Sequence, residues 1–178
     1  MASDLFDRQM AMYTGFHRDG RNRLTHVFGI PAIILAVLIA LATVPLKIGP
    51  LGGIGGWPAT LADLVALLVW LLWIALDLGL GLAMAVVVIP GLIVAHAVVD
   101  GGSAWTTWIV AGTLFVGGWV LQLVGHAYEG RRPAFLSNLF QLLIGPMFLM
   151  AETAFALGLR PGLKRRVEAA AAARAQSR

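Results

Sequence analysis

The sequence lacks cysteine altogether and is poor in charge, since only 12% of its 178 residues are Asp, Glu, Lys or Arg. The absence of cysteine excludes a disulfide scaffold, thiolate metal ligands and a cysteine nucleophile. Soluble domains carry about 25% charged residues, so the scarcity of charge argues against an ordinary water-soluble globular protein. The sequence also has no dinucleotide-binding, phosphate-loop or serine-hydrolase motif. The common soluble enzyme classes are therefore not indicated.

Apolar residues are abundant instead, at 59% of the chain, and the mean hydropathy is +0.84. A single core of this size cannot bury so many apolar side chains, which predicts a lipid bilayer as the solvent. The formal net charge is +4, but the basic residues cluster at the ends of apolar stretches, where anionic headgroups attract them. We therefore expect an integral membrane protein with membrane lipids, and no nucleic acid, as partners.

The first 23 residues are predicted to form an amphipathic interfacial helix. Charged residues interrupt this segment throughout, which argues against a signal peptide. Its apolar side chains recur every three or four positions from Leu5 to Phe16, and Ser3 is a suitable N-cap. Gly20 is expected to end the helix in a left-handed turn.

Four membrane spans are predicted to follow, each near the length of about 20 residues that a crossing needs. Residues 60–99 would extend about 60 Å as one helix, so the chain must fold back, and Asp77, Gly79 and Gly81 mark the turn. Pro31 is expected to kink the first span. The predicted fold is an all-α polytopic membrane bundle with spans at 24–46, 60–76, 80–99 and 104–125 and an external loop at 47–58.

The last apolar block, 134–159, is expected to be broken at Gly145-Pro146 and partly re-entrant. Four crossings return the chain to the side of its N-terminal arginines, in agreement with the positive-inside rule. A fifth crossing would place the basic residues 160–166 outside, although five spans remain the alternative. Residues 1–163 are taken as one domain, and 164–178 as a basic, Ala-rich tail that forms a frayed helix.

Three histidines far apart in the sequence are expected to meet at one membrane face, namely His17, His26 and His126. Imidazole nitrogens suit iron, zinc or copper. Glu129 follows His126 by three residues, so on a continuous helix it shares the same face, as a fourth ligand or as a group that orients a histidine. His96 is predicted to lie at the opposite end of the bundle and is excluded from this cluster.

Several strings resemble the yeast-type 2-hydroxy fatty acid dioxygenase family. They are Tyr-x-x-x-His-Arg at 13–18, Asn-x-x-x-His-x-x-Gly-x-Pro at 22–31, Trp-x-x-Gln-x-x-Gly-His-x-x-Glu-x-Arg-Arg-Pro-Ala at 119–134, and Asn138, Gln141, Gly145-Pro146 and Glu152. The resemblance implies a membrane enzyme that uses Fe(II) and O2 in the α-oxidation of 2-hydroxy fatty acids, shortening the chain by one carbon. It places the family's histidines on His17, His26 and His126.

The resemblance also implies how a substrate binds. A 2-hydroxy acid can chelate iron through a carboxylate oxygen and its hydroxyl, and Arg18, Arg131 or Arg132 can pair with the carboxylate. Asn22 and Gln122 are candidate donors to the ligands, and the acyl tail is expected to lie between helices.

The expected location is the inner membrane of a bacterium, with the site at the cytoplasmic face. The alternatives are a haem-b electron carrier, in which two of the histidines are axial ligands, and a non-catalytic transporter or lipid-binding protein.

Overall fold

The computed structural model describes residues 2–16, 19–46, 58–130 and 140–176. Within these ranges the regular elements are helices, and an isolated β-bridge pairs Pro45 with Thr60. The helices are α1 (Ala2–Phe16), α2 (Gly20–Ala42), α3 (Leu61–Leu76), α4 (Leu78–Ala83), α5 (Ala85–Gly101), α6 (Ala104–Glu129), α7 (Phe140–Ala156) and α8 (Pro161–Gln176).

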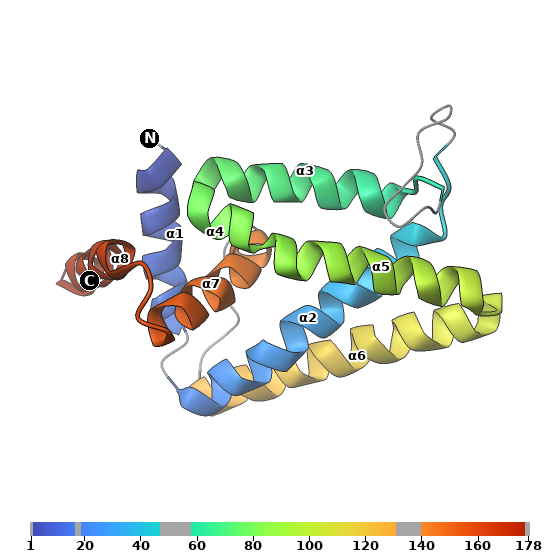
Figure 1. Ribbon diagram of the computed structural model, residues 1–178. Helices are drawn as coiled ribbons and strands as arrows, with labels where there is room; N and C mark the ends of the chain where they lie inside the picture. The colour runs from blue at the N-terminus through green and yellow to red at the C-terminus, as the bar shows by residue number, and fades with distance from the viewer. Residues whose placement is uncertain (1, 17–18, 47–57, 131–139, 177–178) are drawn as a thin grey trace.

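The long helices α2, α3, α5 and α6 run lengthwise through the molecule, and α4 continues into α5 (Figure 1). Three described stretches are long and apolar enough to cross a membrane, namely Gly20–Ala42, Leu78–Gly101 and Ala104–Tyr128. The apolar helix α3 is shorter, at 16 residues or about 24 Å. Less than a third of each long stretch is buried within the protein, and each stretch exposes several large apolar side chains, as lipid-solvated helices do. The predicted all-α membrane bundle is confirmed.

Two polar residues explain where helices begin. The Asp77 carboxylate accepts a hydrogen bond from the Leu80 amide at 2.9 Å, which caps α4 and confirms the predicted turn. The Asp19 carboxylate accepts from the Arg21 amide at 2.8 Å and caps α2. Gly20 is therefore the first residue of α2, and the left-handed turn expected there is wrong. Pro31 lies inside α2 without interrupting it.

The C-terminal segment breaks later than the sequence predicted. Helix α7 runs continuously through Gly145 and Pro146, and the chain turns by 120° between α7 and α8. The turn uses left-handed backbone at Gly158 (φ 73°) and Arg160 (φ 56°). Gly145 instead serves close packing, because a Cβ there would lie 3.2 Å from the Tyr13 hydroxyl oxygen.

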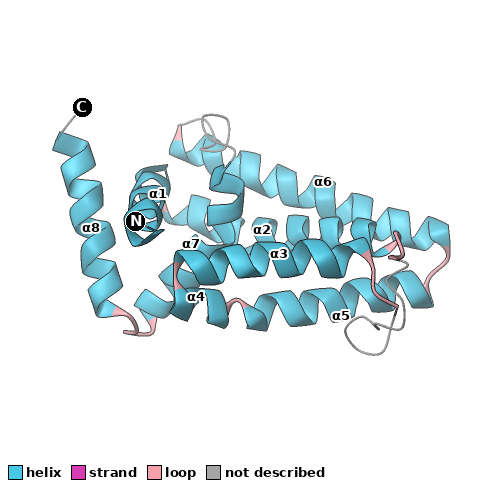
Figure 2. Cartoon of the chain, turned by 90° about the horizontal axis from the view of Figure 1, so that it is seen from above, coloured by secondary structure: helices cyan, strands magenta, loops and turns pink. Residues whose placement is uncertain are grey.

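Ion pairs fix α7 and α8 at the end of the bundle that holds the N-terminus (Figures 1 and 2). On α7, Glu152 pairs with Arg23 at 3.2 Å, which joins it to the start of α2. At the following turn, Arg160 pairs with Asp77 at 2.7 Å. This arrangement agrees with a segment that stays at one end and disagrees with a fifth crossing.

Helix α8 packs on α1. Phe6 and Met10 of α1 and Leu163 and Val167 of α8 are buried, and an ion pair between Arg166 and Asp7 spans the two helices at 2.9 Å. The apolar face of α1 is thus covered by other helices of the chain. The predicted division after Leu163 falls inside α8, and the independence of the tail stays a prediction.

Candidate functional site

Glycines allow α2 and α6 to cross closely. A Cβ on Gly118 of α6 would lie 2.9 Å from the carbonyl oxygen of Gly29 on α2, and a Cβ on Gly125 would lie 2.5 Å from Asn22 Oδ1. Only residues without side chains fit at such approaches. The crossing brings the first turns of α2 against the last turns of α6, which are distant in sequence.

His26 of α2 and His126 of α6 meet at this crossing. Their ring centroids are 5.0 Å apart and the ring planes are nearly perpendicular, at 84°. Both side chains are buried, with 2% and 6% of their surface exposed. Two imidazoles that bind one ion through nitrogens at about 2.1 Å have ring centres roughly 5 Å apart. The pair therefore has the spacing of two ligands on one metal ion.

The orientation of His26 is set by a backbone carbonyl. Its Nδ1 lies 2.8 Å from the carbonyl oxygen of Asn22, one helical turn earlier. Because a carbonyl can only accept, Nδ1 carries a proton, so the neutral form of this ring has its lone pair on Nε2. A histidine held in this way is a typical metal ligand. The suggested role of the Asn22 side chain as a donor to the ligands stays a prediction, because the contact with His26 is made by the Asn22 backbone.

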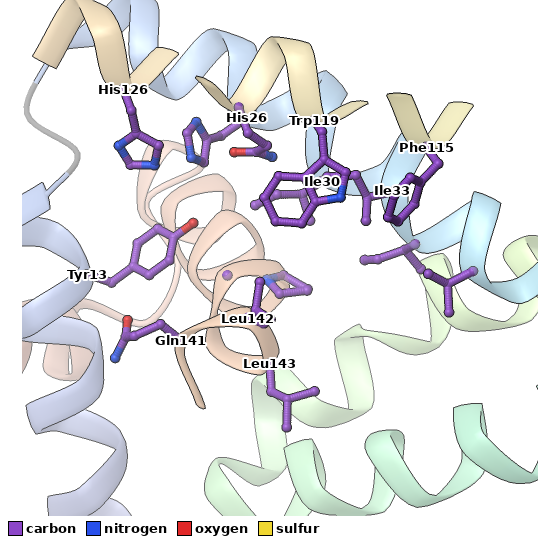
Figure 3. Close-up of a pocket in the computed structure, with 15 residues that line it drawn as sticks. Tyr13, His26, Ile30, Ile33, Phe115, Trp119, His126, Gln141, Leu142 and Leu143 are labelled. Atoms are coloured by element: carbon purple, nitrogen blue, oxygen red, sulfur yellow. The ribbon is translucent and has the colours of Figure 1, made fainter. Parts of the chain in front are cut away.

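The two histidines line a cavity of about 440 Å³ between α1, α2, α6 and α7. Figure 3 shows the hydroxyl of Tyr13 on the same side of the cavity as both rings, with Trp119, Phe115 and the α7 side chains around the rest. Burial raises the pKa of the Tyr13 phenol, so the group stays protonated. The cavity thus joins a polar end to predominantly apolar walls.

Buried amides complete the polar end. Gln141 of α7 donates through Nε2 to Gln9 of α1. Gln122 precedes His126 by one turn of α6, and its Nε2 is buried without a hydrogen-bond partner among the described residues. Because buried donors normally have a partner, this nitrogen is available to a bound ligand. The suggested role of Gln122 as a donor to the site stays a prediction.

The remaining predicted site residues are not placed. His17, Arg18, Arg131 and Arg132 lie outside the described residues. Glu129 is the last residue of α6, so the helix is continuous from His126 as expected, but its side chain is not described. Within the described part of the chain no three metal-ligating side chains gather. Of the three histidines predicted to share a site, the structure describes two, His26 and His126, and the three-histidine site stays a prediction.

His96 does lie apart from this pair, as predicted. Its Nε2 is 3.0 Å from Asp63 Oδ2, and His96 is 4% exposed. Asp63 also accepts from the amide and hydroxyl of Thr60, both at 2.8 Å, which begins α3. These residues form a structural polar cluster at the far end of the bundle.

Asp19, Arg21 and Tyr128 form an exposed cluster at the end of the bundle that holds the two histidines. The side-chain hydrogen bond from Arg21 is the main reason that the pKa of Asp19 falls to about 2. The same guanidinium lies 4.5 Å from the ring centre of Tyr128 on α6, a cation–π contact. This contact ties the first turn of α2 to the last turn of α6.

Fold and site together define a membrane-type helical bundle with paired buried histidines at the polar end of an apolar cavity. The family described as 2-hydroxy-palmitic acid dioxygenase Mpo1-like matches residues 3–157, and the chain belongs to this family. The 2-hydroxy-palmitic acid dioxygenase MPO1 of Saccharomyces cerevisiae is 31% identical over 162 residues, covering 90% of this chain and 86% of the yeast protein. No solved structure matches the chain.

Sequence reasoning gave no role to three residues that line the cavity, namely Tyr13, Trp119 and Gln141. Each belongs to a string that carried the family resemblance, and that is the signal that could have found them. Spacing alone could not, because aromatic and amide side chains on apolar helices are more often packing residues.

Proposed function

We propose that this protein is a membrane-embedded, Fe(II)-dependent dioxygenase that acts on 2-hydroxy fatty acids and shortens them by one carbon. The observation that carries the proposal is the His26–His126 pair, 5.0 Å between ring centroids, at the polar end of an apolar cavity. Membership of the family and the name of the yeast relative support the dioxygenase class.

His26 and His126 would hold the iron, with His17 as the proposed third ligand and Glu129 as a further ligand or orienting group. When bound, Fe(II) would supply the redox-active centre at which O2 is activated, and the hydroxy acid, which is oxidised as its C1–C2 bond breaks, would supply the remaining electrons. Neutral imidazoles leave the positive charge of the ion uncompensated, which favours an anionic hydroxy acid beside it. The chain's part is to hold the ion and the substrate in fixed positions.

The cavity residues have separate tasks in this proposal. Protonated Tyr13 donates a hydrogen bond to a substrate oxygen, and Gln122 Nε2 can donate a second. Arg18 or Arg131 pairs with the carboxylate, as the resemblance implied. The apolar walls exclude water, which strengthens each of these interactions.

The geometry speaks against the haem alternative. Axial histidines bind opposite faces of a haem, whereas rings with centroids 5.0 Å apart leave no space for a macrocycle between them. The break at Gly145-Pro146 that suggested the transporter alternative is not present, because α7 is continuous there and the chain bends between α7 and α8 instead. Metal binding and turnover in detergent, without a membrane gradient, would argue against that alternative.

The charge distribution supports a location for the site. Arg8 of α1, Arg21 and Arg23 of α2 and the basic first turns of α8 belong to the end of the bundle that holds the histidines. By the positive-inside rule this end faces the cytoplasm. A bacterial inner membrane remains part of the proposal.

The test is to purify the protein in lipid nanodiscs, measure bound iron, and follow 2-hydroxypalmitic acid and its one-carbon-shorter product under O2 by mass spectrometry. His26→Gln and His126→Gln should each lower bound iron and turnover at least tenfold per folded protein. His96→Gln is the matched control, a buried histidine with another partner, and should keep both. Full iron content and turnover in the first two variants would contradict the proposal, as would equal losses in all three.

A further inference from the structure

A second cavity of about 230 Å³ lies between α2, α3, α5 and α7. Six residues line both cavities, namely Ile33, Ile34, Val37, Leu142, Leu143 and Pro146. Because the two cavities share these residues of α2 and α7, they are adjacent, and the two together are called the passage below. This passage begins at the histidines and continues between the long helices.

The polarity of the passage falls along its length. The first cavity has the two histidines, Tyr13, Gln122 and Gln141 at one end. Among the residues that line the second cavity, Trp73 alone has a polar side-chain atom, and its indole N–H already donates to the Leu143 carbonyl at 2.8 Å. The second cavity therefore has no side-chain hydrogen-bonding group to offer a ligand, and its lining suits a hydrocarbon chain.

The lining of α2 gives the length of the passage. From His26 to Leu41 the lining residues recur at helical spacing, so they form one stripe along that helix. Fifteen residue steps correspond to about 22 Å. One leaflet of a bilayer has a hydrocarbon depth of about 15 Å, half of the full core. The passage is thus long enough for an acyl chain of the length found in membrane lipids.

The far end of the passage is bordered by Leu41 and Ala66. The bridge between Pro45 and Thr60 holds the end of α2 beside the start of α3, so Leu41 and Ala66 lie at a similar depth. Ala66 is buried at 8% exposure and is the smallest side chain that lines the second cavity. A larger side chain at this position would occupy the far end without reaching the histidines.

We propose that the two cavities form one acyl tunnel, with the substrate carboxylate at His26 and His126 and its methyl end near Ala66, and that Ala66 sets the longest chain accepted. This inference rests on the proposed function for the identity of the head group. The tunnel itself requires only an acyl chain.

The test is a graded series at one position, Ala66→Val, Ala66→Leu and Ala66→Phe, assayed in nanodiscs with saturated 2-hydroxy acids that differ by two carbons. Each buried methylene contributes about 0.8 kcal/mol, or roughly fourfold in affinity, so excluding two methylenes should lower kcat/KM about fifteenfold. Ala66→Phe should show this loss for the longest acids and change the shortest by less than twofold. The losses in the valine and leucine variants should lie between those of the wild type and Ala66→Phe. These milder variants keep the test valid if the phenylalanine variant does not fold.

Leu68→Phe is the matched control, since Leu68 is on the same helix and exposed, and it should keep the wild-type chain-length profile. An unchanged profile across the Ala66 series, or an equal loss for all lengths, would overturn the tunnel.

A second measurement separates the tunnel from the reaction. Unhydroxylated fatty acids should raise the apparent Tm of the wild type more as they lengthen, and this gain should stop at a shorter length in Ala66→Phe. If no 2-hydroxy acid is turned over but this dependence appears, the proposed function fails and the tunnel stands. A rise in Tm that does not depend on the length of the fatty acid would overturn the tunnel and would indicate a groove filled by bulk lipid.

Discussion

Replacing Gly118 with alanine should separate α2 from α6 and disturb the histidine pair. The new Cβ would lie 2.7 Å from Ile33 Cγ1, 2.9 Å from the Gly29 carbonyl oxygen and 3.2 Å from the Ile33 amide nitrogen. Comfortable contacts are about 3.5–4.0 Å. Two of the three neighbours are backbone atoms, so the strain cannot be relieved by rotating a side chain, and the helices must move apart.

The magnitude follows from two opposing effects. Overpacking of this kind costs about 1–3 kcal/mol, and the better helix propensity of alanine returns up to about 1 kcal/mol. The net loss should be about 1–2 kcal/mol, or roughly 3–6 °C in Tm for a chain of this size. Because a displacement of about 1 Å at a reacting centre can cost a hundredfold in rate, turnover should fall further than stability does.

Gly117→Ala is the matched control, because a Cβ at Gly117 meets nothing within 4 Å. It should keep iron binding and turnover, with a Tm equal to or slightly above that of the wild type. The assay is thermal unfolding in nanodiscs together with bound iron and kcat/KM for both variants. Equal Tm values and equal turnover in the two variants would refute the close-crossing argument.

Two further predictions concern polar groups outside the histidine pair. Asp63→Asn and His96→Gln should each lower the free energy of unfolding by about 1–3 kcal/mol, and the double variant should lose less than the sum because the two share one interaction. Additive losses in denaturation experiments would contradict that pairing. The folded pKa of Asp19, about 2, lies below the unfolded value of about 3.9. The negative charge of Asp19 therefore stabilises the fold at pH values above the unfolded pKa. This stabilisation is lost as the pH falls through the folded pKa. The Tm difference between wild type and Asp19→Asn, which retains an N-cap acceptor, should therefore be constant above pH 5 and shrink between about pH 4 and pH 2; a difference independent of pH would count against the ion pair.

Composition and hydrophobic runs predicted the helices well, because an apolar stretch that crosses a bilayer needs about 20 residues and such stretches are visible in the sequence. The break between the predicted helices 60–76 and 80–99 was inferred from Asp77, Gly79 and Gly81. In the structure α3 ends at Leu76, and the Asp77 carboxylate caps α4, which begins at Leu78. The same reasoning failed at Gly145-Pro146. There the glycine is needed for contact with Tyr13, a residue more than 130 positions away, and local sequence carries no sign of such a contact.

The site was predicted in part for a similar reason. Topology alone placed His26 and His126 at one end of the bundle, and their rings meet there. It also separated His96 from them, and His96 has its own carboxylate partner. The cavity between the histidines and α7 was not predicted, because it depends on how α7 folds back beneath α2. That arrangement depends on contacts between distant residues, such as the ion pair between Glu152 of α7 and Arg23 of α2, which no periodic pattern reports.

The glycines of α2 and α6 connect these observations. In a bilayer, lipid tails compete with side chains for apolar contact, so helices associate chiefly where small residues let their backbones approach. Gly29 and Gly118 supply that approach where the two helices cross. The contact fixes the helix register with His26 opposite His126, and the centroids of the two rings lie 5.0 Å apart. The small residues that let the two backbones approach therefore also place two histidines that are distant in sequence at the same end of the first cavity.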